Sequence, residues 1–136
     1  MPDFQLDPRI AGDTVPVAEF ALSDLRLMND RRFPWLVLVP RRAGMSEIID
    51  LNEADRTALL GEVLQVSEAL RAATACDKLN VGALGNIVRQ LHVHVVARFE
   101  SDAAWPGPVW GSGAAIPYAV GEVESLVGQL TAAGIA

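Results

Sequence analysis

The chain is poor in the residues that cross-link proteins or bind transition metals. Cysteine occurs once, at Cys76, and histidine twice, at His92 and His94, among 136 residues. A single cysteine excludes an internal disulfide framework and suits a reducing compartment. No stretch of about 18 consecutive apolar residues is present, so we expect no membrane-spanning helix.

Positive charge is also scarce. The 17 acidic and 11 basic residues give a formal net charge of −6, which disfavours a polyanion such as DNA or RNA. A small phosphorylated ligand needs only local positive charge and stays open. Most of the arginines are expected to form the solvated rim of strands.

A secretory signal is absent from the first residues, because 1–6 include Asp3 and contain no apolar run of sufficient length. We therefore expect a cytoplasmic protein. At 136 residues, 51% of them apolar, the chain has the size and composition of one domain with a filled core, spanning 1–136.

The apolar pattern alternates between strand and helix periods. The pair Asn29-Asp30 and the pair Gly85-Asn86 supply turn chemistry between consecutive strands, which predicts two antiparallel hairpins. The predicted elements are strands over 24–29, 35–39, 79–83 and 88–98, a long amphipathic helix over 53–75, a helix-compatible segment over 121–133, a segment over 4–13 that is irregular or a short helix, and an irregular stretch over 100–117.

Both histidines fall in the last predicted strand. Two-residue periodicity places Gln90, His92 and His94 on one face and Leu91 and the following valines on the other. Solvent-exposed histidines without a function are the simpler interpretation. A binding site is favoured, because the polar face follows a Gly-Asn turn whose backbone N–H groups can meet an anion.

This polar face suits phosphoryl chemistry. A neutral imidazole can attack phosphorus with one nitrogen if an acceptor, such as the carbonyl two residues earlier, holds its other N–H. His92 is then the nucleophile, while His94 binds a phosphate oxygen or relays a proton. The Gln90 side chain donates to the phosphate or orients the neighbouring ring.

A zinc or iron site is the rival chemistry, since His-x-His pairs also bind metals. A further ligand would have to come from a carboxylate such as Asp30, or from Cys76, because no other histidine exists. We expect neither a metal nor another cofactor.

The segment Gln90-Leu-His-Val-His-Val-Val96 resembles the signature of the histidine triad (HIT) family, His-x-His-x-His followed by apolar residues, whose middle histidine is the nucleophile. Trp35-Leu-Val-Leu-Val-Pro40, the long helix, Lys78-Leu-Asn80, Gly85-Asn86 and Trp105-Pro106-Gly107 follow in the family's order. The resemblance implies an α+β, HIT-like fold: a twisted antiparallel sheet of about five strands, one long packed helix and a C-terminal helix.

The resemblance also implies a function. Similar proteins are homodimers that bind purine nucleotides and cleave nucleoside phosphoramidates or dinucleoside polyphosphates at the α-phosphorus through the histidine nucleophile. The roles that the resemblance implies are catalysis for His92, His94 and Gln90, ribose binding for Asp30, ribose and phosphate contacts for Asn80, phosphate contacts for Gly85 and Asn86, and a place near the active site for the tail that carries Trp105.

Three departures from the family pattern bear on activity. Gln90 replaces the first triad histidine, Trp35 stands where many members have a fourth, and Ile87 replaces a hydroxyl residue. A catalytically weak nucleotide-binding or regulatory module is therefore the alternative to a hydrolase or transferase. A structural or interaction protein, with the tryptophans of the tail anchoring a partner, is the third possibility.

Overall fold

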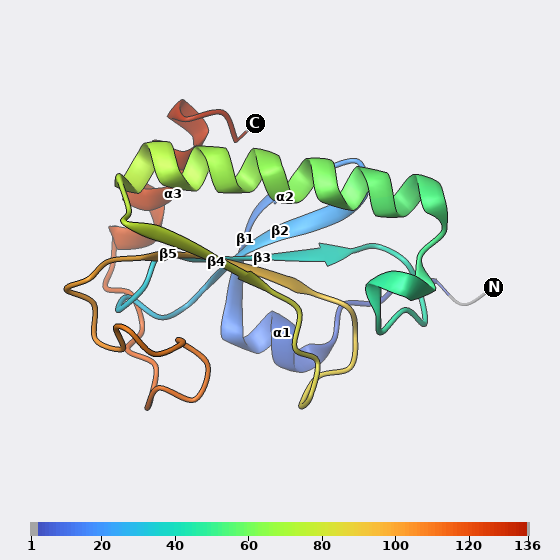
Figure 1. The fold of residues 1–136 in the computed structure, drawn as a ribbon, viewed down its shortest axis with the longest axis horizontal. Coiled ribbons are helices and arrows are strands. Elements are labelled where there is room, and N and C mark those ends of the chain that lie inside the picture. Colours follow the sequence, from blue (N-terminus) through green and yellow to red (C-terminus); the bar gives the residue numbers. More distant parts are fainter. Residues whose placement is uncertain (1–2, 136) are drawn as a thin grey trace.

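The structure is a computed structural model that describes residues 3–135 as a five-stranded sheet with helices on both faces (Figure 1). None of the helices in this part of the chain is long and apolar enough to cross a membrane. In chain order the elements are α1 (Pro8–Asp13), β1 (Thr14–Glu19), β2 (Ser23–Met28), β3 (Trp35–Pro40), the 3-10 turn η1 (Ile48–Asp50), α2 (Glu53–Thr74), β4 (Lys78–Gly82), β5 (Val93–Arg98) and α3 (Glu122–Ala132).

The sheet is antiparallel throughout, with the strand order β1-β2-β3-β5-β4. Both predicted hairpins form, β2 with β3 and β4 with β5. The expected α+β fold with about five strands is confirmed. The fifth strand, β1, was missed, because Pro16 interrupts its pattern; an edge strand with a local register shift tolerates this proline.

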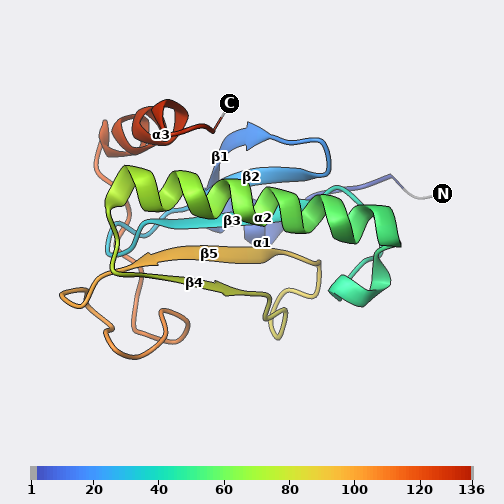
Figure 2. The ribbon, with the colours of Figure 1, turned by 45° about the horizontal axis from the view of Figure 1, so that its top comes forward.

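Helix α2 covers one face of the sheet (Figure 2). It begins where predicted, because the Asn52 side chain accepts a hydrogen bond from the Asp55 N–H, and it ends at Ala75 in the left-handed conformation. Its buried face, including Leu59, Val66 and Leu70, packs in one core with the strands and with α3. The long helix was thus predicted to within one residue.

The opposite face of the sheet is covered by α1 and by the loop that follows β5 (Figure 1). A second core lies here, made of Ile10, Phe33, Trp35, Val37, Val39, Val96 and Val109. This face carries the two histidines, so the N-terminal segment and the C-terminal loop together form the walls of their surroundings.

Strand β5 begins at Val93 and not at the predicted residue 88. Residues 88–92 hydrogen-bond elsewhere: the Leu91 N–H donates to the Met45 carbonyl, and the Gln90 side chain bonds the N-terminal segment. His92 therefore lies just before the strand, and His94 lies in it.

Candidate active site

His92 is held by a backbone carbonyl. Its Nδ1 lies 2.6 Å from the carbonyl oxygen of Gln90, which can only accept, so Nδ1 carries the proton. The proton-free Nε2 is then available as a nucleophile. This is the arrangement that the sequence suggested, and it does not depend on the side chain at position 90.

His94 lies beside His92, with 4.9 Å between the ring centroids, so the two imidazoles share one face as the strand period predicted. The Trp35 indole N–H donates to Nδ1 of His94 over 2.9 Å. Burial, followed by the charge of His92, lowers the pKa of His94 to about 4. At neutral pH His94 is therefore uncharged and carries its proton on Nε2, where it can donate to a ligand.

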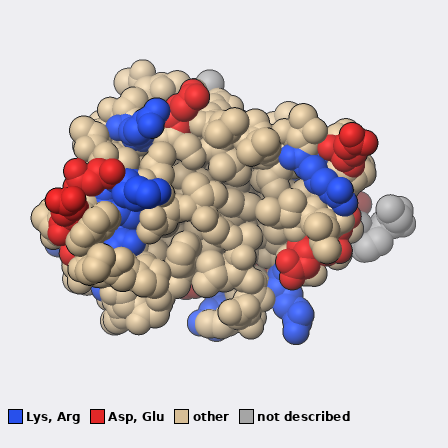
Figure 3. Space-filling model, viewed as in Figure 1, with Lys and Arg blue, Asp and Glu red and all other residues tan. Residues whose placement is uncertain are grey.

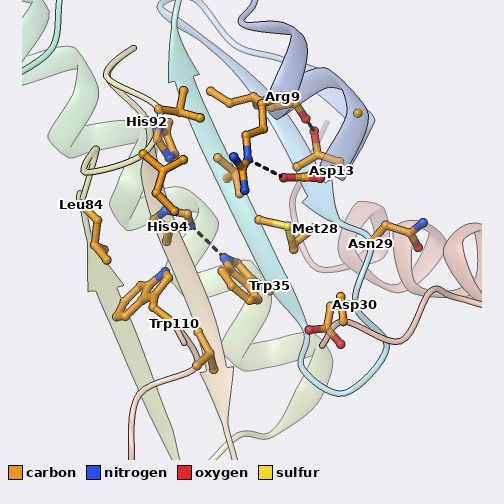
Figure 4. Close-up of a pocket in the computed structure, with 18 of the residues that line it drawn as sticks. Arg9, Asp13, Met28, Asn29, Asp30, Trp35, Leu84, His92, His94 and Trp110 are labelled. Carbon is orange, nitrogen blue, oxygen red and sulfur yellow. Dashed lines mark hydrogen bonds and ion pairs between the residues drawn. The ribbon is translucent and has the colours of Figure 1, made fainter. Parts of the chain in front are cut away.

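Two tryptophans enclose the His94 ring (Figure 4). The Trp110 ring lies 5.4 Å from it and 6.4 Å from Trp35, each pair edge to face. Strand β4 leaves room for Trp110 because Gly82 has no side chain. A Cβ at this position would lie only 3.3 Å from the indole. The loop after β5 thus reaches the histidines of its own chain, through Trp110.

These side chains line a pocket of about 690 Å³ on the sheet face opposite α2. Its walls come from α1, from the end of β2, from β3 and β5, from the β4–β5 connection and from the loop after β5. The polar or charged lining residues include Arg9, Asp13, Asn29, Asp30, Arg32, Asn86, His92 and His94.

Gly85 and Asn86, to which the resemblance assigns phosphate contacts, lie in the pocket wall. Gly85 has φ +71, a conformation that glycine adopts without strain. Ile87 also lines the pocket and is 75% exposed, so this turn offers backbone groups and an apolar side chain but no hydroxyl.

Asp30 lines the pocket, yet its carboxylate is already engaged. Arg32 donates to both oxygens, at 3.0 and 2.9 Å, and the Ile116 N–H donates to one of them. Burial by itself would raise the pKa of Asp30, but the hydrogen bonds from Arg32 and from the Ile116 N–H, together with the charge of Arg32, hold it below its usual value. A ribose at this wall would meet a carboxylate that is shared with Arg32.

The Gln90 side chain does not face the pocket. Its Oε1 accepts from the Asp7 N–H at 2.8 Å, and its Nε2 donates to the Gln5 carbonyl at 2.7 Å. The expected contact with a phosphate or with a neighbouring ring is therefore wrong for this side chain. Gln90 contributes its backbone carbonyl to the site and its side chain to the N-terminal segment.

Asn80 and Trp105 lie outside the pocket lining, contrary to expectation. Both contact Arg98, which is 1% exposed: Asn80 accepts from its guanidinium, and the Trp105 ring stacks on it at 5.7 Å. Arg98 also forms a buried ion pair with Asp102 and donates to the Gly107 carbonyl. This cluster fixes the course of the loop that brings Trp110 to His94.

Within residues 3–135, no three side chains of histidine, cysteine, aspartate or glutamate are grouped so as to hold a metal ion. Cys76 packs against the core that contains α2, and Asp30 is paired with Arg32. Neither is placed to complete a metal site with the two histidines.

The sequence pattern did not indicate that Arg9 belongs to the site, and it assigned no specific contact to Trp110. Arg9 lies 83 residues before His92 in the chain, and nothing in its local pattern marks it as part of a site. Figure 4 shows its side chain extending from α1 into the pocket, with the guanidinium between Asp13 and the histidines.

The chain was compared with protein-family models and with solved structures, and both comparisons point to the family whose motif contains His92 and His94. The HIT domain model matches residues 11–101. The chain belongs to the HIT domain family. Solved structures of similar proteins include a histidine triad protein from Sinorhizobium meliloti 1021, with 48% identity, 95% of this chain and 96% of that chain covered, and a TM-score of 0.93.

Two further HIT structures extend the likeness over nearly the whole chain. The histidine triad protein from Bradyrhizobium japonicum is 44% identical, covering 99% of this chain and 100% of that one, with a TM-score of 0.96. The protein from Marinobacter aquaeolei VT8 is 42% identical, with the same coverage and a TM-score of 0.95. None of the curated proteins compared with the chain matches it.

Proposed function

We propose that this HIT protein is a nucleotidyl hydrolase or transferase that uses His92 as its nucleophile. Its substrates would be purine nucleoside phosphoramidates or dinucleoside polyphosphates, attacked at the α-phosphorus. The observation that carries the proposal is the 2.6 Å contact between His92 Nδ1 and the Gln90 carbonyl, because it leaves Nε2 free at the pocket.

The reaction has two displacements. The lone pair of His92 Nε2 forms a bond to phosphorus, and the bond from phosphorus to the leaving group breaks with its electron pair going to the leaving group. The imidazole becomes a cation whose Nδ1–H stays on the Gln90 carbonyl. Water, or another acceptor, then attacks phosphorus, the P–N bond breaks, and neutral His92 is restored as a proton is released.

Hydrogen-bond donors around His92 suit the charge that develops on the phosphoryl oxygens. His94 offers its Nε2–H, because the Trp35 indole occupies the other nitrogen. The Gly85-Asn86 turn adds backbone groups at the pocket wall. Such preorganised donors are a large part of catalysis in enclosed sites.

Substitution of the nucleophile tests the proposal. His92→Ala should lower kcat/KM for both substrate classes to the background rate, while His94→Ala should reduce it by about a hundred- to ten-thousandfold. Full activity in His92→Ala would show that His92 is not the nucleophile.

A nucleotide-binding module without fast turnover is the second candidate. It is favoured by the Gln90 side chain, which is bonded to residues 5 and 7 and gives no imidazole to the site. The two candidates differ in one respect: a binder retains nucleotide affinity but never forms a bond to His92.

We also propose that the protein acts as a homodimer. Strand β4 is an edge of the sheet, and exposed edges are commonly paired or covered. Leu60 and Leu64 on α2 are 60% and 53% exposed, and Val81 on β4 is 50% exposed. Figure 3 shows the centre of the face over α2 and β4 to be free of charged residues.

Strand β3, which precedes α2 in the chain, lies in the middle of the sheet between β2 and β5. The proposed interface is therefore formed by α2 and β4. A second copy meeting the same patches about a two-fold axis would cover both the edge and the exposed leucines. We also propose that the protein works in a reducing compartment such as the cytoplasm, because its only cysteine is Cys76.

A further inference from the structure

Arg9 lies in the wall of the proposed active-site pocket, although it precedes the residues matched by the HIT domain model. Only one other lining residue is cationic among those described, Arg32, and its guanidinium is bound to Asp30 and to the Ser112 carbonyl. Within residues 3–135, Arg9 has no comparable partner. Its side chain is 62% exposed and lies 4.0 Å from an Asp13 carboxylate that is 59% exposed.

The position of Arg9 is fixed from two sides. Ile10, the next residue, is 5% exposed and packs in the core beneath the histidine face. Ahead of α1, the Gln90 amide bonds the backbone of Gln5 and Asp7, and Asp7 caps α1 by accepting from the Arg9 N–H. The side chain at the first triad position thus anchors the segment that carries Arg9, while its own carbonyl holds His92.

The chemistry of the leaving group gives Arg9 a role. An amine leaving group needs a proton, whereas a phosphate leaving group departs as an anion and needs a nearby positive charge. His94, with a pKa of about 4, is neutral at pH 7 and donates a hydrogen bond without releasing its proton. Arg9, whose charge is not neutralised by a close ion pair, is therefore better suited to an anionic leaving group than His94 is to protonating an amine.

We propose that Arg9 binds the anionic leaving group of a dinucleoside polyphosphate, and that Gln90 is a positioning residue that holds Arg9 beside His92. The proposal rests on the function proposed above, and it makes the preferred substrates those whose bond to the α-phosphorus runs to a further phosphate. His92 Nε2 bonds to the α-phosphorus, the bond to the bridging oxygen breaks, and the electron pair stays on the departing phosphate, paired with the Arg9 guanidinium.

The first experiment compares kcat/KM on a diadenosine polyphosphate and on an adenosine phosphoramidate. Arg9→Gln should lower the value for the polyphosphate by about ten- to a hundredfold and change that for the phosphoramidate by less than about threefold. Arg9→Lys should recover part of the loss. Arg71→Gln, which removes the same charge from the exposed end of α2, should leave both values unchanged. Equal losses on both substrates, or none, would overturn the role of Arg9.

The second experiment concerns Gln90. Gln90→Ala keeps the backbone carbonyl that holds His92, so it should lower the polyphosphate rate selectively, as Arg9→Gln does. The double variant should be no worse than Arg9→Gln alone, because both changes remove one interaction. Equal slowing of both substrates by Gln90→Ala, or losses that multiply in the double variant, would contradict positioning through Arg9.

Binding separates failure of the inference from failure of the proposed function. If the wild-type protein cleaves neither substrate, the proposed enzymatic function is wrong, yet calorimetry with AMP and ATP still tests Arg9. Wild type should bind ATP more tightly than AMP, and Arg9→Gln should remove most of that preference. A preference that survives Arg9→Gln, in a protein that folds as wild type does, would show that Arg9 does not meet the distal phosphates.

Discussion

The indole of Trp35 donates to Nδ1 of His94 across the pair of neighbouring strands β3 and β5, at 2.9 Å. Because the indole has no acceptor, this bond fixes the tautomer of His94 and directs its Nε2–H to the pocket. A hydrogen-bond acceptor at position 35 would instead hold the proton on Nδ1 and leave Nε2 without one. The tryptophan makes the second histidine a permanent hydrogen-bond donor.

Removal of this indole donor should impair catalysis while leaving the nucleophile in place. Trp35→Phe frees His94 to adopt the other tautomer, whose Nε2 lone pair would repel a phosphate oxygen. We expect kcat/KM to fall by about tenfold or more. Trp35→His, which can still donate, should lose less. Nitrogen NMR of the imidazoles reports the tautomer directly, and an unchanged His94 tautomer in Trp35→Phe would refute this role.

The low pKa of His94 predicts loss of stability on acidification. The unfolded chain takes up this proton near pH 6.5 but the folded protein only near pH 4, so stability falls as the pH drops through this range. The full effect is on the order of 3 kcal/mol. Urea unfolding at pH 7 and pH 4.5 measures it, and His94→Asn should flatten the difference. An equal pH dependence in that variant would rule out His94 as its source.

The buried Arg98–Asp102 pair should be important for folding. Its side chains are 2% and 4% exposed, and the Arg98 guanidinium lowers the pKa of Asp102 to about 2. Asp102→Asn should reduce the free energy of unfolding by about 3–5 kcal/mol, because it leaves the arginine charge buried. Glu122→Gln, in the exposed pair with Arg31, should cost less than about 1 kcal/mol. Similar costs for both variants in urea unfolding would contradict this account.

A charge on the exposed face of α2 should separate the proposed dimer. Leu64→Glu places a carboxylate on the exposed side of α2, where a second copy in the proposed interface would have to bury it. Light scattering at micromolar concentration should show a dimer for wild type and a monomer for Leu64→Glu. Val120→Glu, at a fully exposed position outside α2 and β4, serves as the control and should stay dimeric. A wild-type monomer would refute the assembly.

Local sequence signals were sufficient for most of the fold. Asn52 and the leucines and valines of α2 marked a helix that the structure ends one residue earlier, at Thr74. The two-residue spacing of His92 and His94 placed both rings on one face, and their contact follows. The start of β5 was wrong by five residues, since bonds to distant segments, and not the local pattern, divert residues 88–92.

Long-range contacts account for what the sequence could not predict. The Gln90 amide forms hydrogen bonds with residues more than 80 positions away in the chain. Neither these partners nor the position of Arg9 in the pocket wall could be predicted from a local pattern. Asp30 and Arg32 are two residues apart, yet their ion pair depends on the turn between β2 and β3. Asn80 and Trp105 both contact the buried Arg98, and neither lines the pocket.

Capture of the covalent intermediate tests the central claim most directly. Wild-type protein mixed with a diadenosine polyphosphate is quenched in alkaline denaturant, digested, and analysed by mass spectrometry. The account predicts one adenylyl group on His92, formed as fast as the substrate is cleaved and absent from His92→Ala. Turnover without an adduct on His92, or with the adduct on another residue, would contradict it.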